Sequence, residues 1–289
     1  MSLINQTCWV VGGVGVVGRG ITRGLLQAGA TVIVNSRSPA RLEGLKESLG
    51  NPDRLIAVNG SLLPGDAEKT VSEALKSTPL NHVVSHGAVR WWARKSPGKF
   101  QFYEYSEGCD ETYSLNIKAA NKLLDMKPKD FTSASAQLAS LHFSAAQQLM
   151  PQLELSGGKS SYTFVTGDSS GKPGHGRTTM GEINSHHVWG LATALRQELQ
   201  DSPVVNCREI RIGVAINRPD EERKMAPRHR PISESIGDLC AGLVANATKT
   251  DDSGRLFNIN EQEQLEDLID EYSANREDGV ASLPHYYCD

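Results

Sequence analysis

The chain has 289 residues, of which 38% are hydrophobic and 22% are charged, and this fits one large α/β domain with a substantial core. Thirty basic and thirty-four acidic side chains give a formal charge of -4. A negative net charge excludes a strong overall electrostatic attraction to nucleic acid or to an anionic membrane. We therefore expect a small-molecule substrate, with no nucleic acid and no membrane as partners.

The cysteines point to an intracellular protein. They are widely spaced and form no CxxC or Cys/His pairing, so the sequence predicts reduced thiols and no metal site. Strand-like sequence begins by Thr7, which leaves no room for a secretory signal, and no apolar run reaches membrane-spanning length. We expect a cytoplasmic protein.

Short β-branched runs alternate with amphipathic stretches along the chain, which predicts βαβ units. Strands are predicted at 7–11, 31–35, 54–58, 81–86, 161–166, 208–215 and 255–259. Helices are predicted at 18–29, 64–77, 133–155, 184–200 and 233–247. The pattern indicates the α/β class: a Rossmann-type, doubly wound parallel sheet with helices on both faces, in a single domain.

Two regions interrupt this alternation. Residues 90–129 are rich in aromatic and charged side chains, and we interpret them as a pocket-side insertion with a helix near 115–126. Residues 1–260 then form the nucleotide-binding domain, and residues 261–289 form a last helix, at 261–275, followed by a tail.

A glycine-rich turn directly follows the first predicted strand. Gly13, Gly15 and Gly18 match GxGxxG at the start of a helix, with Gly12 before them and Val16 and Val17 between the last two. Glycines at this spacing permit a tight turn and let backbone N–H groups approach a pyrophosphate at the positive end of the helix. The sequence therefore predicts dinucleotide binding.

The end of the second strand predicts which dinucleotide is bound. An NAD-binding site would carry an acid there, whereas this chain has Ser36, Arg37 and Ser38, followed by Arg41. The Arg37 guanidinium can pair with a 2′-phosphate and the two hydroxyls can donate to it, which favours NADP(H). Arg41 either adds charge to this site or is a solvated loop residue.

From about Thr7 to Asn260 the sequence resembles the short-chain dehydrogenase/reductase superfamily. The family's TGxxxGxG turn corresponds to residues 11–18, and its NNAG motif corresponds to Ser85–Ala88. The resemblance implies that residues after the third and fourth strands also line the cofactor: Gly60, Ser61, His86, Gly87 and Ala88.

The family's catalytic pair is missing. Members carry Tyr-x-x-x-Lys on the helix after the fifth strand, where the tyrosine acts as general acid/base. In this chain Gly181 and Ser185 stand at those two positions. No choice of register restores the pair, because no tyrosine lies between Tyr162 and Tyr272 and no lysine lies between 172 and 224.

Asp168 and Ser169 are the candidate catalytic residues in place of that pair. Asp168 follows the fifth strand, at the sheet edge where open α/β folds bind ligands, and its carboxylate can hold a cationic C=N group beside a nicotinamide. Ser169 is a possible hydrogen-bond donor. Both residues also fit a polar turn whose side chains are satisfied by backbone N–H groups.

Three tryptophans are candidates for the substrate pocket: Trp91, Trp92 and Trp189. The first two can form an apolar or cation-binding wall, or instead form core under the insertion. Trp189 lies on the same helix face as Ser185. His186 and His187 lie next to Ser185 on this helix. Adjacent helical residues point in different directions, so at most one of the two histidines can reach the cleft.

These residues favour an atypical NADPH-dependent oxidoreductase that reduces a small organic substrate, such as an imine, an iminium or a conjugated system. The missing pair and Asp168 also give a thinner resemblance to fungal indole-alkaloid reductases, including bifunctional reductase/Diels–Alderases. The alternatives are a non-catalytic NADP(H) sensor or scaffold, and a cyclase or isomerase that reuses the pocket. By analogy with the family, a homo-dimer or homo-tetramer is expected.

Overall fold

A single parallel sheet organises the protein. The structure is a computed structural model that describes residues 2–76, 78–87, 123–167, 179–214, 216, 233–247 and 252–272. The strands follow the order β3-β2-β1-β4-β5-β6-β7 in a seven-stranded sheet. Their bounds are β1 (Thr7–Val11), β2 (Thr31–Ser36), β3 (Leu55–Asn59), β4 (His82–His86), β5 (Ser160–Gly167), β6 (Val205–Ile212) and β7 (Leu256–Ile259).

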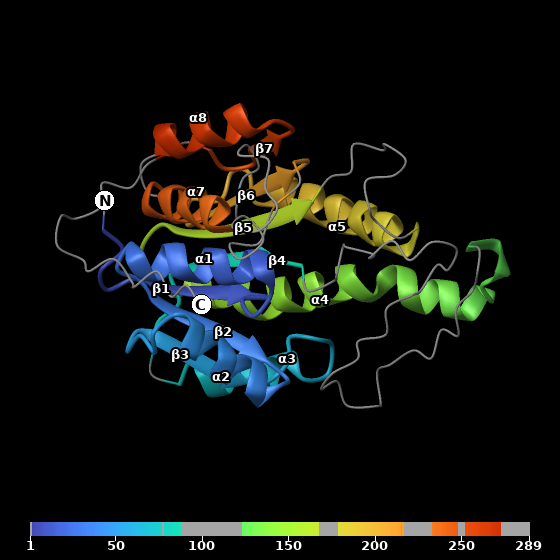
Figure 1. The fold of residues 1–289 in the computed structure, drawn as a ribbon, viewed down its shortest axis with the longest axis horizontal. Helices are drawn as coiled ribbons and strands as arrows, with labels where there is room; N and C mark the ends of the chain where they lie inside the picture. The colour runs from blue at the N-terminus through green and yellow to red at the C-terminus, as the bar shows by residue number, and fades with distance from the viewer. Residues whose placement is uncertain are drawn as a thin grey trace, which may run out of the picture.

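Helices cover both faces of this sheet (Figure 1), which confirms the predicted doubly wound Rossmann-type fold. They are α1 (Val16–Gln27), α2 (Pro39–Ser48), α3 (Ala67–Ala74), α4 (Pro128–Glu154), α5 (Thr179–Glu198), α7 (Ser233–Ala245) and α8 (Gln262–Tyr272), with a 3-10 turn η1 (Leu123–Asp125). The strand order reverses between β1 and β4. In this architecture ligands bind outside the carboxyl ends of the strands at that reversal.

Each face of the sheet has its own hydrophobic core. On one face, side chains of α1, α2, α7 and α8 pack on Val10, Val34 and Ile210. On the other face, α3, α4 and α5 pack on Trp9 and Phe164. The helices α1 and α7 approach very closely, because a Cβ atom on Gly20 would lie 2.0 Å from the carbonyl oxygen of Ser233. Small residues at this crossing therefore fix how α7 sits on the sheet.

The structure differs from the sequence prediction at several helices. The prediction missed α2. Within this helix, which lies wholly in the described part of the chain, only Leu42 and Leu45 are buried, so no long apolar stripe marks it. Its start is fixed instead by Ser38, which caps the helix, and by Pro39 in the first turn. Helix α4 begins at Pro128 rather than at residue 133, and η1 is the described part of the helix predicted at 115–126.

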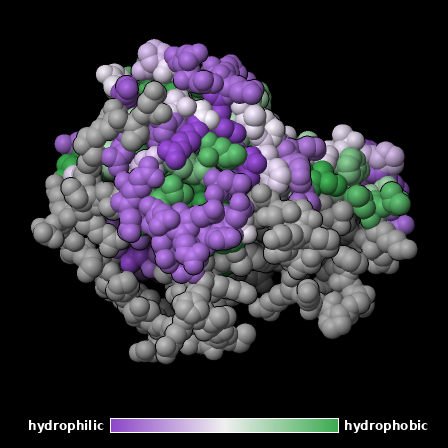
Figure 2. All heavy atoms as spheres, turned by 90° about the horizontal axis from the view of Figure 1, so that it is seen from above, coloured by the Kyte–Doolittle hydropathy of each residue, from purple (hydrophilic) through white to green (hydrophobic). Residues whose placement is uncertain are grey.

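The N-terminal half of α4 extends beyond the sheet, at the right of Figure 1. Figure 2 shows hydrophobic side chains at the surface near this end of the molecule. Two large hydrophobic residues are exposed in this part of the chain, Leu124 and Phe131. Further along α4, Phe143 is 51% exposed. Among the described residues, no helix combines the length and the hydrophobicity that crossing a membrane requires.

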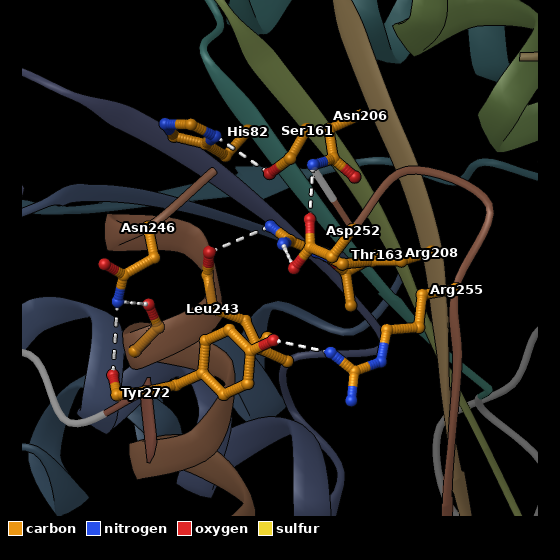
Figure 3. A network of polar contacts seen from close by, with 11 residues as sticks. His82, Ser161, Thr163, Asn206, Arg208, Leu243, Asn246, Asp252, Arg255 and Tyr272 are labelled. Atoms are coloured by element: carbon orange, nitrogen blue, oxygen red, sulfur yellow. Dashed lines mark hydrogen bonds and ion pairs between the residues drawn. The ribbon is translucent and has the colours of Figure 1, made fainter. Parts of the chain in front are cut away.

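A buried polar network joins β5, β6 and α7 on the face of the sheet that α7 covers (Figure 3). The Arg208 guanidinium is fully buried and donates from all three nitrogens: Nη1 to Asp252 Oδ2 at 2.7 Å, Nε to Thr163 Oγ1, and Nη2 to the Leu243 carbonyl. The amide of Asn206 donates to the other oxygen of Asp252. Because every nitrogen of the cation has a partner, the network compensates for the desolvation of its charge.

Neutralising Asp252 should therefore destabilise the protein strongly. We expect Asp252→Asn to lower the free energy of unfolding by about 3–5 kcal/mol, because the Arg208 charge would stay buried without its counter-ion. Urea unfolding of the variant and the wild type measures this difference.

The matched control is the pair Glu43–Lys46, whose closest atoms are 3.8 Å apart and whose side chains are 61% and 38% exposed. Glu43→Gln should change the free energy of unfolding by less than about 0.5 kcal/mol. Similar small effects in both variants would show that the Arg208–Asp252 pair contributes no more than a surface ion pair.

Candidate functional site

The turn between β1 and α1 contains two glycines, Gly12 and Gly18, that a larger residue cannot replace without a shift of the backbone. Gly12 has φ +74°, and a Cβ atom there would lie 2.5 Å from the carbonyl oxygen of His86. The N–H of Gly15 donates to the Gly12 carbonyl at 3.0 Å. A Cβ atom on Gly18 would lie 2.1 Å from that same carbonyl oxygen, and one on Gly13 would meet the Val34 methyl groups.

This turn leaves the start of α1 open to an anion. The N-cap residue is Gly15, which has no side chain to accept a hydrogen bond from the first turn, and the first turn holds no acidic residue. Val16 and Val17 are the first helical residues, so their N–H groups point toward the helix N-terminus. Backbone donors and the helix dipole together favour a phosphate group, so these residues fit the expected dinucleotide.

The residues predicted to select NADP(H) lie together at the carboxyl end of β2. Ser36 Oγ accepts a hydrogen bond from the N–H of Ser38, and Ser38 Oγ accepts one from the N–H of Arg41 at 3.4 Å. Each hydroxyl oxygen accepts in these bonds, so its proton can still be donated to another group. The side chains of Arg37 and Arg41 are exposed, and α2 fixes the position of Arg41.

Gly60 and Ser61 follow β3 and are tied to the neighbouring strand and helix. Trp9 Nε1 donates to Asn35 Oδ1, and Asn35 Nδ2 donates to the Gly60 carbonyl. The N–H of Ser61 donates to Thr70 Oγ1, and Ser61 is buried. The Trp9–Asn35 bond, which links the core to this edge of the sheet, was not predicted from the sequence.

His86 and Gly87 bring the end of β4 against the glycine turn. The Nδ1 atom of His86 lies 3.3 Å from the Val165 carbonyl oxygen, which it can reach as a donor in one tautomer. Burial lowers the pKa of His86 to about 4, although the Val165 carbonyl opposes this shift. The ring is therefore neutral near pH 7, and its place beside the cofactor stays a prediction.

Gly181 and Ser185 lie one turn apart on α5, at the positions that correspond to the tyrosine and lysine of the family. Ser185 is buried, and its hydroxyl donates to the Gly181 carbonyl at 2.9 Å. This pair offers neither a phenol nor an ammonium group. The hydroxyl of Ser185 bonds within its own helix, and the loss of the family's proton relay stays a prediction.

Next to this pair, α5 inserts side chains into the backbone of α4. The Asn184 amide donates to the Ala134 carbonyl and accepts from the N–H of Leu138, so it bridges two groups that would otherwise bond each other within the helix. His187 Nδ1 lies 2.6 Å from the Ser135 carbonyl oxygen. These contacts fix the spacing of α4 and α5, and sequence reasoning did not find them.

Trp189 lies at the carboxyl end of β5, where its Nε1 donates to the Gly167 carbonyl at 3.3 Å. The Arg211 guanidinium lies 4.6 Å from the centre of its ring, and the His186 ring lies 4.2 Å away. Arg211 is also paired with the fully buried Glu209 at 2.9 Å. These neighbours orient the indole beside the strand end, and its role as a pocket residue stays a prediction.

The remaining predicted residues lie outside the described part of the chain. These are Ala88, Trp91, Trp92, Asp168 and Ser169, together with residues 90–122 of the insertion and the tail after residue 272. Their roles stay predictions. Among the residues that the structure does describe, no cluster of three or more His, Cys, Asp or Glu side chains could hold a metal ion.

A buried polar pair near the end of β4 was not predicted. His142 of α4 places Nδ1 at 2.7 Å from Ser85 Oγ of β4. The sequence contains one clue, because His142 lies in the helical stripe formed by Leu138, Ala145 and Leu149, all of which are buried. A histidine in an apolar stripe needs a polar partner.

Comparisons with known proteins agree with this geometry at the level of the fold. The family model described as "NADP oxidoreductase coenzyme F420-dependent" matches residues 9–78, about a quarter of the chain. No curated protein matches the sequence at a significant level.

Solved structures of similar fold cover most of the chain at low identity. The Pseudomonas aeruginosa RhlG/NADP active-site complex is 18% identical with a TM-score of 0.63, over 90% of this chain and 96% of that one. A short-chain dehydrogenase/reductase from Serratia marcescens is 14% identical with a TM-score of 0.65, over 91% and 100%. A 3-ketoacyl-(acyl-carrier-protein) reductase from Brucella melitensis, complexed with NADH, is 16% identical with a TM-score of 0.61, over 89% and 98%. The chain therefore has the fold of short-chain dehydrogenase/reductase structures.

The glycine turn provides a direct test of the site geometry. Gly18→Ala would place a methyl group against the Gly12 carbonyl, so the turn must open, and we expect a loss of about 1–3 kcal/mol or more in the free energy of unfolding. Denaturant unfolding measures the loss. The control is Gly190→Ala in α5, where a Cβ atom meets nothing within 4 Å and should stabilise the helix by about 0.5–1 kcal/mol. Equal stability of the two variants would contradict the close contact.

Proposed function

We propose that the protein is an NADP(H)-dependent oxidoreductase that acts on a small organic substrate. The single observation that carries this proposal is the glycine turn, which presents the uncapped N-terminus of α1 at the point where the strand order reverses. The similar structures support it, because one is described as an NADP complex and another as an NADH complex.

The end of β2 supports a preference for NADP(H). Ser36, Arg37 and Ser38 provide a guanidinium and two hydroxyls where an NAD-binding site would have a carboxylate, and residues 35–41 contain no acid. A planar guanidinium can form two charge-assisted hydrogen bonds with a phosphate, which gives both affinity and discrimination against a ribose hydroxyl.

We propose further that the substrate is an imine, an iminium or a conjugated system rather than a simple ketone. Bound NADPH would supply a hydride. Reduction of a ketone also needs an acid that protonates the developing alkoxide, and Gly181 and Ser185 offer none. A cationic C=N group becomes neutral when it accepts hydride, so the useful protein group is a carboxylate that holds the cation. Asp168 is our candidate, with Ser169 as a hydrogen-bond donor.

A second function is favoured by the same Gly181–Ser185 observation. A protein that keeps the nucleotide site and lacks the catalytic pair can act as a non-catalytic NADP(H) sensor or scaffold, or as a cyclase or isomerase in which the nucleotide is structural. Association as a homo-dimer or homo-tetramer through α4 and α5 is also proposed, and the exposed Phe143 of α4 offers apolar surface for it.

A fluorescence titration with NADPH and NADH tests the cofactor proposal. We expect NADPH to bind at least about 10-fold more tightly than NADH, and Arg37→Ala to weaken NADPH binding about 10-fold while leaving NADH binding unchanged. The control is Lys159→Ala. Lys159 is an exposed cation directly before β5, at the amino ends of the strands rather than at their carboxyl ends, so its removal should change neither affinity. If neither nucleotide binds the wild type, both the oxidoreductase and the sensor proposals are wrong.

Turnover separates the oxidoreductase from the sensor and from the cyclase. We expect NADPH oxidation with cyclic iminium substrates, and a loss of at least about 100-fold in kcat/KM for Asp168→Ala with NADPH affinity unchanged, since a positioned charge contributes several kcal/mol to such a step. Absorbance at the NADPH band follows the reaction. Tight NADPH binding without oxidation on iminium or enone substrates would favour the sensor, whereas product formation that is independent of the redox state of the nucleotide would favour the cyclase.

A further inference from the structure

His142 is a buried histidine with only one of its ring nitrogens engaged. It is 1% exposed, and its ring lies between α4 and the sheet, 6.1 Å from the ring of Phe164. The Nδ1 atom contacts Ser85 Oγ at 2.7 Å. The Nε2 atom has no hydrogen-bond partner within the part of the chain that the structure describes. A buried polar atom without a partner costs about 1–3 kcal/mol, so this atom is expected to serve a purpose.

The unpartnered Nε2 atom faces the end of β4. A Cβ atom built on Gly87 would lie 3.3 Å from it, and Leu138 Cδ1 would be the next neighbour at 3.4 Å. Gly87 directly follows β4, whose carboxyl end borders the reversal of strand order. Nε2 is itself buried, and because residue 87 has no side chain, none from this position fills the space between the nitrogen and the end of β4, the side on which ligands of this fold bind.

The position of His142 relative to the reversal of strand order between β1 and β4 indicates which half of a dinucleotide it faces. In a doubly wound fold each half of the sheet binds one mononucleotide. The glycine turn and the Ser36–Ser38 segment belong to the half that contains β1, β2 and β3. His142 packs on β4 and β5, in the other half. The group that meets Nε2 therefore belongs to the second nucleotide rather than to the adenosine.

The imidazole is suited to a neutral hydrogen bond. Burial lowers the pKa of His142 to about 3, and the nearby His86 lowers it further, so the ring carries no charge near pH 7. A neutral ring has one donor and one acceptor nitrogen, and because the Ser85 hydroxyl can donate to Nδ1 or accept from it, Nε2 takes the complementary role. Such a group binds a hydroxyl or a carboxamide without the desolvation cost of a charge.

We propose that His142, oriented by Ser85, is a cofactor-binding residue whose Nε2 atom hydrogen-bonds a hydroxyl or carboxamide of the nicotinamide half of NADP(H). This inference rests on the proposed function. It assigns to α4 a contact with the half of the cofactor that the glycine turn does not reach, and it gives the unpartnered nitrogen its partner.

Two ligands separate this proposal from the proposed function: NADPH, and adenosine 2′,5′-bisphosphate, which lacks the nicotinamide half. We expect His142→Asn to weaken NADPH binding by about 10-fold and to leave binding of the bisphosphate unchanged. The asparagine amide can keep the contact to Ser85 and has no atom at Nε2. His142→Gln, whose amide reaches the Nε2 position, should recover part of the loss.

Gly87→Ala provides an independent variant, because its Cβ atom would lie 3.3 Å from Nε2 and occupy the space beside it while residue 142 stays a histidine. It should also weaken NADPH selectively. Equal NADPH affinity in the wild type and in His142→Asn would overturn the role of His142 alone, whereas failure of the wild type to bind either ligand would overturn the proposed function and this inference together.

A spectroscopic readout on the wild type avoids any dependence on variant folding. In protein labelled with ¹⁵N-histidine, the Nε2 resonance of His142 should shift when NADPH is added and stay in place when the bisphosphate is added. An Nε2 resonance that is unchanged at saturating NADPH would show that this nitrogen does not meet the cofactor, and would overturn the inference.

Discussion

The contact between the backbones of Gly12, Gly18 and His86 is the constraint on which the rest of the site depends. The Gly12 carbonyl takes up the space where Gly18 would carry a side chain, and the His86 carbonyl does the same for Gly12. The ends of β1 and β4 and the start of α1 therefore meet without intervening side chains. This close approach brings the start of α1, which no side chain caps, next to the end of β4, where Gly87 packs against His142.

The sequence predicted the sheet well because its strands are buried on both faces and read as short β-branched runs between clear breaks. It missed α2 for the opposite reason. That helix buries few side chains and is fixed by the cap at Ser38 and by Pro39, which are signals of a start rather than of a periodic stretch. Helix α4 began earlier than predicted because Pro128 favours a helix start before the apolar stripe begins.

The glycine turn could be predicted because local backbone geometry restricts the residue type at each of its positions. The contacts of Asn184 and His142 could not, because they join residues 46 to 57 positions apart and depend on how α4 lies against α5 and the sheet. Only the composition of the apolar stripe gave a clue, since it contains a histidine where the pattern calls for an apolar residue. Such a clue indicates a partner and does not identify Ser85.

The groups buried at this edge restrict the chemistry that the site can perform. His86 and His142 stay neutral near pH 7, because burial lowers their pKa values to about 4 and about 3, and a neutral imidazole binds and orients rather than acting as a strong acid. Ser185 bonds within α5, and the Arg211 cation is paired with Glu209. These groups can hold a cofactor and position a substrate. A reaction in which the acceptor is already cationic needs no proton from them, which is the reason that we propose iminium reduction rather than ketone reduction.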